Sequence, residues 1–171
     1  MRHIEDEKQM RAALDAAEAA LANGDFPVGC VISLDGVIVA RGQRRRSQQA
    51  GSRPASELDH AEIIALHNLL DKHPEIAPGR VIVYSTMEPC LMCYATMLVN
   101  GIRHIVYAYE DIMGGGTNLH LTGLPPLYKN MQVSITPGVL RKQSLALFKQ
   151  FFASSPDYMR GTILAKYTLS A

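Results

Sequence analysis

The stretch "RVIVYSTMEPCLMCYATMLVNGIRHIVYAY", residues 80–109, decides the fold of this chain. It opens with a run of β-branched and aromatic residues and continues with a segment of helical length that ends at Asn100-Gly101. A second run of the strand type, residues 102–109, closes it. Two strands joined by a helix lie parallel in one sheet, with a right-handed crossover. The stretch therefore predicts a strand–helix–strand unit of an α/β domain.

The segments before this unit extend the same architecture. Apolar residues at helical spacing end at residues 23–25, and "FPVGCVISLDGVIVARG" (26–42) predicts two strands that turn at Asp35-Gly36. The segment "HAEIIALHNLL" (60–70) is apolar nearly all round, which predicts a buried helix.

The segments after the unit complete a mixed sheet with helices on both faces. We expect a flexible glycine loop at 113–118, a short strand at 131–135 and a helix that begins at Pro137. That helix is expected to bury Leu140, Leu147, Phe148, Phe151 and Phe152. The tail, residues 154–171, fits a helix and a strand equally well.

Composition and charge fit a single domain spanning residues 1–171. Hydrophobic residues make up 47% of the chain and charged residues 19%, with a net charge of +1. This charge gives no global attraction to nucleic acid, and we expect no membrane span, since the longest apolar runs are too short. A charged N-terminal segment and only three cysteines predict a cytoplasmic protein without a secretory signal.

The pair Cys90 and Cys93 can be a redox pair, half of a metal site or two buried thiols. At the start of a helix, both sulfurs lie on one face and the helix N-terminus favours their thiolate form. His60 begins a helix of its own and is the candidate for a third ligand. Three protein ligands leave a position for water, as in a catalytic Zn²⁺ site. Cys30, in an apolar strand, is expected to be a packed core residue instead.

Glu62 stands two residues after His60, where it can take a proton from that water. Zinc lowers the pKa of a bound water to about 7. His60, Glu62, Pro89, Cys90 and Cys93 together form H-x-E … P-C-x-x-C, which is the signature of the zinc nucleobase deaminases. The chain resembles the branch of that superfamily that contains tRNA adenosine deaminases, guanine deaminases and cytosine deaminases. The resemblance is carried by the motifs and by "FPVGCVI", "HAEIIAL", "TMEPCLMCYATMLVNGIRHIVYAYED" and "GVLRKQSLALFKQFF".

The resemblance implies a three-layer, cytidine-deaminase-like α/β fold with a mixed five-stranded sheet, one Zn²⁺ per chain and a homodimer. It implies that His60, Cys90 and Cys93 hold the zinc and that Glu62 is the catalytic acid and base. The expected reaction is hydrolytic removal of an exocyclic amino group, released as ammonia, from a nucleobase, nucleoside or nucleotide. For substrate contacts we expect Phe26, Val28, Arg44, Ala61, Pro89 and Asp111.

Two departures from the relatives bear on the substrate. Where relatives commonly carry an asparagine that binds the base, this chain has Arg44, which donates hydrogen bonds but cannot accept them. The tail is also less basic than in tRNA-acting relatives, with only Arg160 and Lys166 after Pro156. We therefore favour a small substrate, with tRNA wobble-adenosine deamination as the alternative. A zinc-containing binding module without activity is the hypothesis from another class.

The polar segment 41–53 carries five arginines and no acidic residue: Arg41, Arg44, Arg45, Arg46 and Arg53. Such a segment can be a solvated loop, or it can bind substrate phosphate at the mouth of the pocket. The tail can cap the pocket or pack on a partner chain. His120 is a weak candidate for a further substrate contact.

Overall fold

A computed structural model of the chain describes residues 2–49, 52, 54–154, 157, 159 and 161–171. A single five-stranded sheet has the order β2-β1-β3-β4-β5. The strands β1 and β2 form the expected antiparallel hairpin, and β1 also pairs antiparallel with β3, whereas β3, β4 and β5 run parallel. The strands are β1 (Gly29–Leu34), β2 (Val37–Gln43), β3 (Ile82–Met87), β4 (His104–Tyr109) and β5 (Ser134–Thr136).

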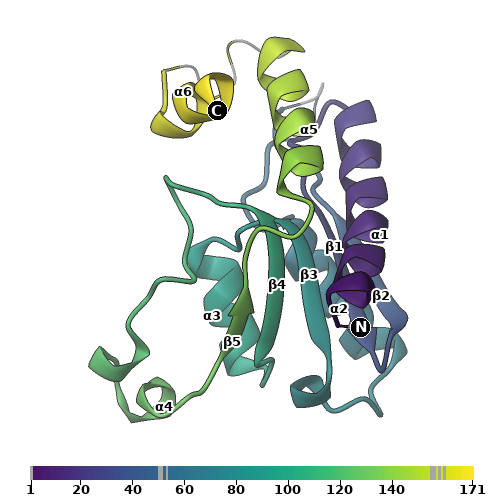
Figure 1. Cartoon of the computed structure of the whole chain (residues 1–171), viewed down its shortest axis with the longest axis vertical. Coiled ribbons are helices and arrows are strands. Elements are labelled where there is room, and N and C mark those ends of the chain that lie inside the picture. The colour runs from purple at the N-terminus through teal and green to yellow at the C-terminus, as the bar shows by residue number, and fades with distance from the viewer. Residues whose placement is uncertain (1, 50–51, 53, 155–156, 158, 160) are drawn as a thin grey trace.

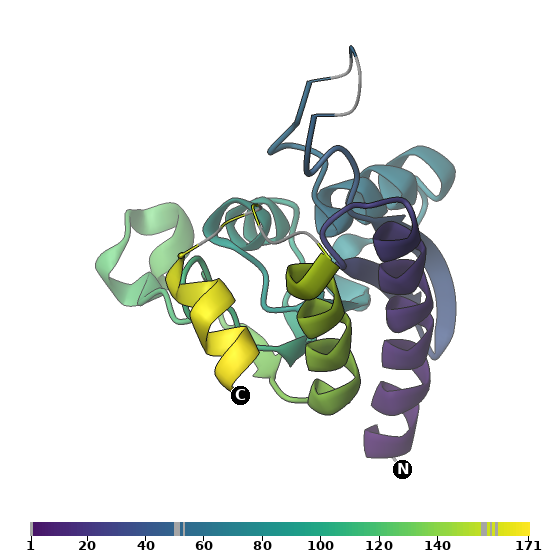
Figure 2. The ribbon, with the colours of Figure 1, turned by 90° about the horizontal axis from the view of Figure 1, so that it is seen from above.

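Helices cover both faces of the sheet, as the sequence predicts (Figure 1). On one face, α1 and α5 pack against the sheet and against each other; on the other, α2 packs on β1 and β2 and contacts α3. The helix α6 lies beside α5 (Figure 2). The helices are α1 (Arg2–Ala22), α2 (Ala61–Lys72), α3 (Leu91–Val99), α4 (Pro126–Lys129), α5 (Arg141–Ser154) and α6 (Ile163–Ser170), with short 3₁₀ turns at Pro78–Arg80 and Leu121–Gly123.

The first turn of α2 packs tightly against β2 of the hairpin. A Cβ atom at Gly42 in β2 would lie 2.1 Å from the carbonyl oxygen of Ala61, so only glycine permits this approach. Within α2, Ala61, Ala65 and Leu69 are buried while Leu70 is exposed. The expectation of a helix buried all round is therefore wrong for its outer face.

Several expected boundaries move in the structure. β2 continues to Gln43, so the first residues of the arginine-rich segment belong to a strand. β5 begins at Ser134, and α5 begins at Arg141, not Pro137. Gly138 and Leu140 have φ values of 83° and 55°, which a right-handed helix cannot contain. As a result Ser144 and Leu145 are buried in α5, and Leu140 and Leu147 are only half-buried.

The tail forms the helix α6, which resolves the ambiguity between helix and strand. Arg53, Pro156 and Arg160 lie outside the described residues. Cys30 is fully buried in the core, as expected. Among the described residues, no helix combines the length and the apolar character that a bilayer crossing requires.

Candidate metal centre and substrate pocket

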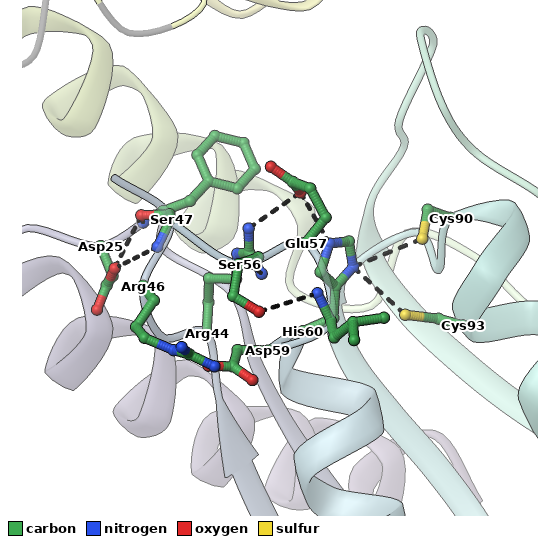
Figure 3. Close-up of polar contacts among 12 residues, drawn as sticks. Asp25, Arg44, Arg46, Ser47, Ser56, Glu57, Asp59, His60, Cys90 and Cys93 are labelled. Atoms are coloured by element: carbon green, nitrogen blue, oxygen red, sulfur yellow. Dashed lines mark hydrogen bonds and ion pairs between the residues drawn. The ribbon is translucent and has the colours of Figure 1, made fainter. Parts of the chain in front are cut away.

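Three predicted ligands meet at the end of β3. His60 is the N-cap of α2, Cys90 is the N-cap of α3, and Cys93 lies in the first turn of α3. Their ligand atoms lie within 4.8 Å of one another, with the two sulfurs 3.5 and 3.4 Å from His60 Nδ1 (Figure 3). Zinc bonds of about 2.3 Å to sulfur and 2.0–2.1 Å to nitrogen, at tetrahedral angles, give a sulfur–nitrogen separation of about 3.6 Å. The three side chains therefore fit one tetrahedral Zn²⁺.

The two cysteines differ sharply in acidity. The pKa of Cys90 is lowered to about 4, mainly by a hydrogen bond from Cys93 and to a smaller extent by one from His60. Cys90 is therefore a thiolate at neutral pH. The hydrogen bond to Cys90, together with burial, raises the pKa of Cys93. The pair thus shares one proton, which a divalent cation can replace because metal binding displaces protons from its ligands.

The carboxyl group of Glu62 lies beside these ligands in the first turn of α2. Its side chain is 5% exposed, and burial is the main cause that raises its pKa. Ser85 Oγ on β3 donates a hydrogen bond of 3.1 Å to Glu62 Oε1, and Cys93 Sγ lies 3.6 Å from Oε2. A buried carboxyl group with a raised pKa is suited to accept and return a proton. Ser85 escaped the sequence analysis because a serine inside a strand carries no signal of its partner.

The outer ring nitrogen of His60 faces a second carboxylate. Glu57 Oε2 lies 3.5 Å from His60 Nε2, and Arg44 Nη2 donates to the same oxygen at 3.1 Å (Figure 3). Arg44 Nη1 donates to the Ser56 carbonyl at 2.8 Å. A carboxylate on the outer nitrogen of a metal-binding histidine orients its ring. The position of Glu57, three residues before His60, is a signal that sequence reasoning could have used.

The metal centre opens into a cavity of about 230 Å³. Five of the six expected substrate contacts line it: Phe26, Val28, Arg44, Ala61 and Asp111. Pro89, one of the described residues, is buried but is not among the lining residues, and its carbonyl accepts the Gly116 N–H at 2.9 Å. The other lining residues are Glu57, His60, Glu62, Met87, Glu88, Cys90, Met113, Gly114, Met159 and Leu164.

Glu88 fixes the glycine loop and was missed by the sequence analysis. Its carboxylate accepts hydrogen bonds from the Asp111 N–H at 3.2 Å, the Thr117 N–H at 3.3 Å and the Thr117 hydroxyl. A Cβ at Gly115 would lie 2.5 Å from Glu88 Cδ, so the loop can pack against Glu88 only with glycine there. These contacts give the loop defined partners in the structure, and its flexibility stays a prediction.

The first part of the arginine-rich segment, up to Ser47, is anchored to the body of the protein. Ser47 Oγ accepts from the Phe26 N–H at 2.9 Å, and Asp25 Oδ1 accepts from the Ser47 N–H at 2.8 Å. Arg46 pairs with Asp59 (Figure 3). Of the four arginines that the structure describes in this segment, only Arg44 lines the cavity, and it is 3% exposed. His120, another described residue, is exposed and does not line the cavity.

Comparisons with known proteins point to one family. The profile of the cytidine and deoxycytidylate deaminase zinc-binding region matches residues 3–109. The chain is 32% identical to a tRNA-specific adenosine deaminase of Haemophilus influenzae over 148 residues, which cover 86% of this chain and 83% of the relative. For a tRNA-specific adenosine deaminase of Bacillus subtilis the identity is 26%, with 86% and 89% covered.

Solved structures share the fold. One from a study of A-to-I editing by tRNA:A34 deaminases at the wobble position superposes with a TM-score of 0.64 and 26% identity, covering 77% of this chain and 97% of that one. A guanine deaminase from Nitrosomonas europaea superposes with a TM-score of 0.68 at 20% identity, covering 86% and 84%. The expected cytidine-deaminase-like fold is thereby confirmed.

Proposed function

The chain belongs to the cytidine and deoxycytidylate deaminase zinc-binding family, and we propose that it hydrolyses the exocyclic amino group of a small, unphosphorylated nucleobase or nucleoside. His60, Cys90 and Cys93 are proposed as the zinc ligands and Glu62 as the catalytic residue. When bound, Zn²⁺ lowers the pKa of water to about 7 and supplies a nucleophile at neutral pH.

Glu62 performs the proton transfers of this reaction. Its carboxylate accepts one proton from the attacking water and gives it to the ring nitrogen as the new carbon–oxygen bond forms. It then takes the second proton from the hydroxyl group now on that carbon and gives it to the amine, so that the carbon–nitrogen bond breaks, ammonia leaves and a carbonyl remains. Burial supports this role because it brings the pKa of Glu62 up towards neutrality. Ser85 holds one carboxyl oxygen through its hydrogen bond.

The charges around the cavity support an unphosphorylated substrate. Four carboxyl side chains line it, from Glu57, Glu62, Glu88 and Asp111, against one guanidinium, from Arg44. Two hydrogen bonds already engage Arg44, to Ser56 and Glu57. An anionic phosphate in this cavity would meet more negative than positive charge, which is unfavourable for binding.

The observation that carries the small-substrate proposal is the position of the tail. Met159 and Leu164, which lie just before and within α6, line the same cavity as Glu62. These two tail residues thus form part of the pocket wall, together with Phe26 and Val28, which precede β1. A cavity of about 230 Å³ that presents apolar side chains such as Phe26, Val28 and Leu164 beside its polar groups suits a planar base, since such ligands are bound mainly by apolar contact with a few polar groups for orientation.

A second candidate is deamination of adenosine at the wobble position of tRNA. It is favoured by the sequence similarity to tRNA-specific adenosine deaminases over most of the chain. This substrate would enter as a base flipped out of the anticodon loop.

Ammonia release from a substrate panel tests these proposals. The panel contains adenine, guanine, cytosine, their nucleosides and monophosphates, and unmodified tRNA, with Glu62→Ala as the blank and Glu75→Ala as a matched control on the exposed loop after α2. We expect turnover of a base or nucleoside by the unaltered protein and by Glu75→Ala only. Faster turnover of monophosphates would contradict the charge argument, and inosine formed only in tRNA would establish the second candidate. Activity that survives Glu62→Ala would refute the assigned mechanism, and a zinc-loaded protein inactive on the whole panel would favour a binding module.

We also propose a homodimer. Leu70 on α2 and Leu91 and Val99 on α3 are exposed apolar side chains on the outer layer of two contacting helices. Covering them with a second copy would remove apolar surface from water. Light scattering should then give twice the chain mass of 18.8 kDa, and a monomer at all concentrations would contradict this proposal.

A further inference from the structure

A cluster of polar and aromatic side chains ties α6 to the end of β4 and to the start of α5. We call it the docking cluster: Tyr109, Glu110, Arg141, Tyr167 and Thr168. Tyr167 donates a hydrogen bond of 2.6 Å to Glu110 Oε1, and Arg141 Nε donates to Glu110 Oε2 at 2.7 Å. The hydroxyl groups of Tyr109 and Thr168 lie 2.9 Å apart.

The cluster combines charge with burial. Tyr109 and Thr168 are fully buried, and the Tyr109 and Tyr167 rings stack with centroids 6.3 Å apart and planes 12° apart. The guanidinium carbon of Arg141 lies 5.4 Å from the Tyr109 ring centroid. The pKa of Glu110 is lowered to about 2, mainly by the hydrogen bond from Arg141 and further by the one from Tyr167. Burial acts in the opposite direction but is outweighed by the hydrogen bond from Arg141. At neutral pH the hydrogen bonds of Arg141 and Tyr167 to Glu110 are therefore made to an ionised carboxylate, the stronger form of acceptor.

The helix α6 depends on these contacts for its position. It is only eight residues long, and helices of that length are marginal in water without tertiary packing. Its outer residues Ile163 and Leu169 are 63% and 57% exposed, whereas Leu164 is 1% exposed. Leu164 and Tyr167 are three residues apart, so they lie on the same side of the helix. The contact that holds Tyr167 therefore also holds Leu164 at the cavity.

The cluster is also joined to the part of the pocket that the glycine loop forms. Asp111 directly follows Glu110 and lines the cavity, and its N–H binds Glu88, which in turn binds Thr117. Glu110 thus lies between the glycine loop and α6. A single carboxylate connects two walls of the cavity that are far apart in the sequence.

We propose that Glu110, Arg141 and Tyr167 are positioning residues that hold α6 as a wall of the substrate pocket and thereby determine how tightly a small substrate is bound. This inference rests on the proposed function of the cavity. The described residues that line the cavity do not include these three side chains. They therefore act on the substrate indirectly, by positioning Leu164 and Asp111, which do line the cavity.

Tyr167→Phe is the sharpest test, because it removes one hydroxyl group and keeps the stacked ring. Tyr128→Phe, on α4 outside the pocket, is the matched control. Amide hydrogen exchange of residues 163–170 should become about tenfold faster in Tyr167→Phe, since it loses a hydrogen bond to a charged group, and should stay unchanged in Tyr128→Phe. Unchanged exchange in Tyr167→Phe would overturn the proposal.

The kinetic measurement separates positioning of the substrate from support of the fold. For a base or nucleoside that the unaltered enzyme deaminates, Tyr167→Phe should raise KM about tenfold with kcat changed less than about twofold, because wall contacts bind substrate and transition state alike. An unchanged KM beside faster exchange would reduce the cluster to a structural role and refute the inference.

Failure of the proposed function is distinguishable from this result. If the unaltered enzyme acts on tRNA only, the function proposal fails, and the exchange of residues 163–170 still decides whether the cluster holds α6. In that case KM is measured with tRNA. A lower KM in Tyr167→Phe would mean that α6 obstructs the pocket instead of completing it, which also overturns the inference.

Discussion

Glu57→Gln tests how the zinc centre is supported. The substitution keeps the shape of the side chain and removes the charge 3.5 Å from His60 Nε2. Zinc binds the neutral imidazole, so what is lost is the contact of the carboxylate with the ring N–H of His60. Because the Glu57 side chain is 80% exposed, we take this contact to be worth about 1.2 kcal/mol, within the usual net range of a hydrogen bond. Such a loss corresponds to about an eightfold weaker zinc affinity, near the lower end of the 10- to 100-fold range measured for outer partners of metal-binding histidines.

Competition with a chromogenic chelator at pH 7 measures this change directly as a zinc dissociation constant. Glu75→Gln is the matched control, because Glu75 Oε1 lies 3.3 Å from His73 Nδ1 in another exposed carboxylate–histidine pair, after the far end of α2. We expect a dissociation constant about eightfold higher for Glu57→Gln and unchanged for Glu75→Gln. Equal zinc affinity in Glu57→Gln and the unaltered protein would show that the carboxylate does not orient His60.

Three further substitutions probe the surroundings of the site. Glu88→Gln removes the charge from an acceptor of three hydrogen bonds and should lower the free energy of unfolding by about 2 kcal/mol in urea denaturation while zinc content stays the same. Phe148→Ala deletes a fully buried ring 5.0 Å from the Phe26 ring and should cost about 3–5 kcal/mol in the same experiment, with a higher KM because Phe26 lines the cavity. Glu110→Gln tests acid stability: since folding lowers the pKa of Glu110 from 4.5 to about 2, its stabilisation is complete above pH 4.5 and is lost as the pH falls to about 2. The loss of stability between these pH values should be smaller in Glu110→Gln, and identical acid denaturation curves would contradict the assignment.

The sequence by itself determined the chemistry and the order of the elements. The spacing of Cys90 and Cys93 is set by one helical turn, and that of His60 and Glu62 by the first turn of another helix, so each half of the site follows from local geometry. The H-x-E … P-C-x-x-C signature joined the two halves. The strand–helix–strand unit likewise follows from local periodicity and the crossover rule. Such features can be predicted from the sequence because the residues that define each of them are close together in the chain.

Only the tertiary structure decided which side chains surround this chemistry. Tyr167 binds Glu110 across 57 positions, and Ser85 binds Glu62 across 23. The sequence suggested Arg44 as a substrate contact, which stays a prediction. Only the fold shows that Arg44 lines the cavity while donating hydrogen bonds to Ser56 and Glu57. The start of α5 also moved to Arg141, because the chain must turn through positive φ values to leave β5. These contacts depend on how the layers pack, and a buried polar group takes whichever partner the packing brings within reach.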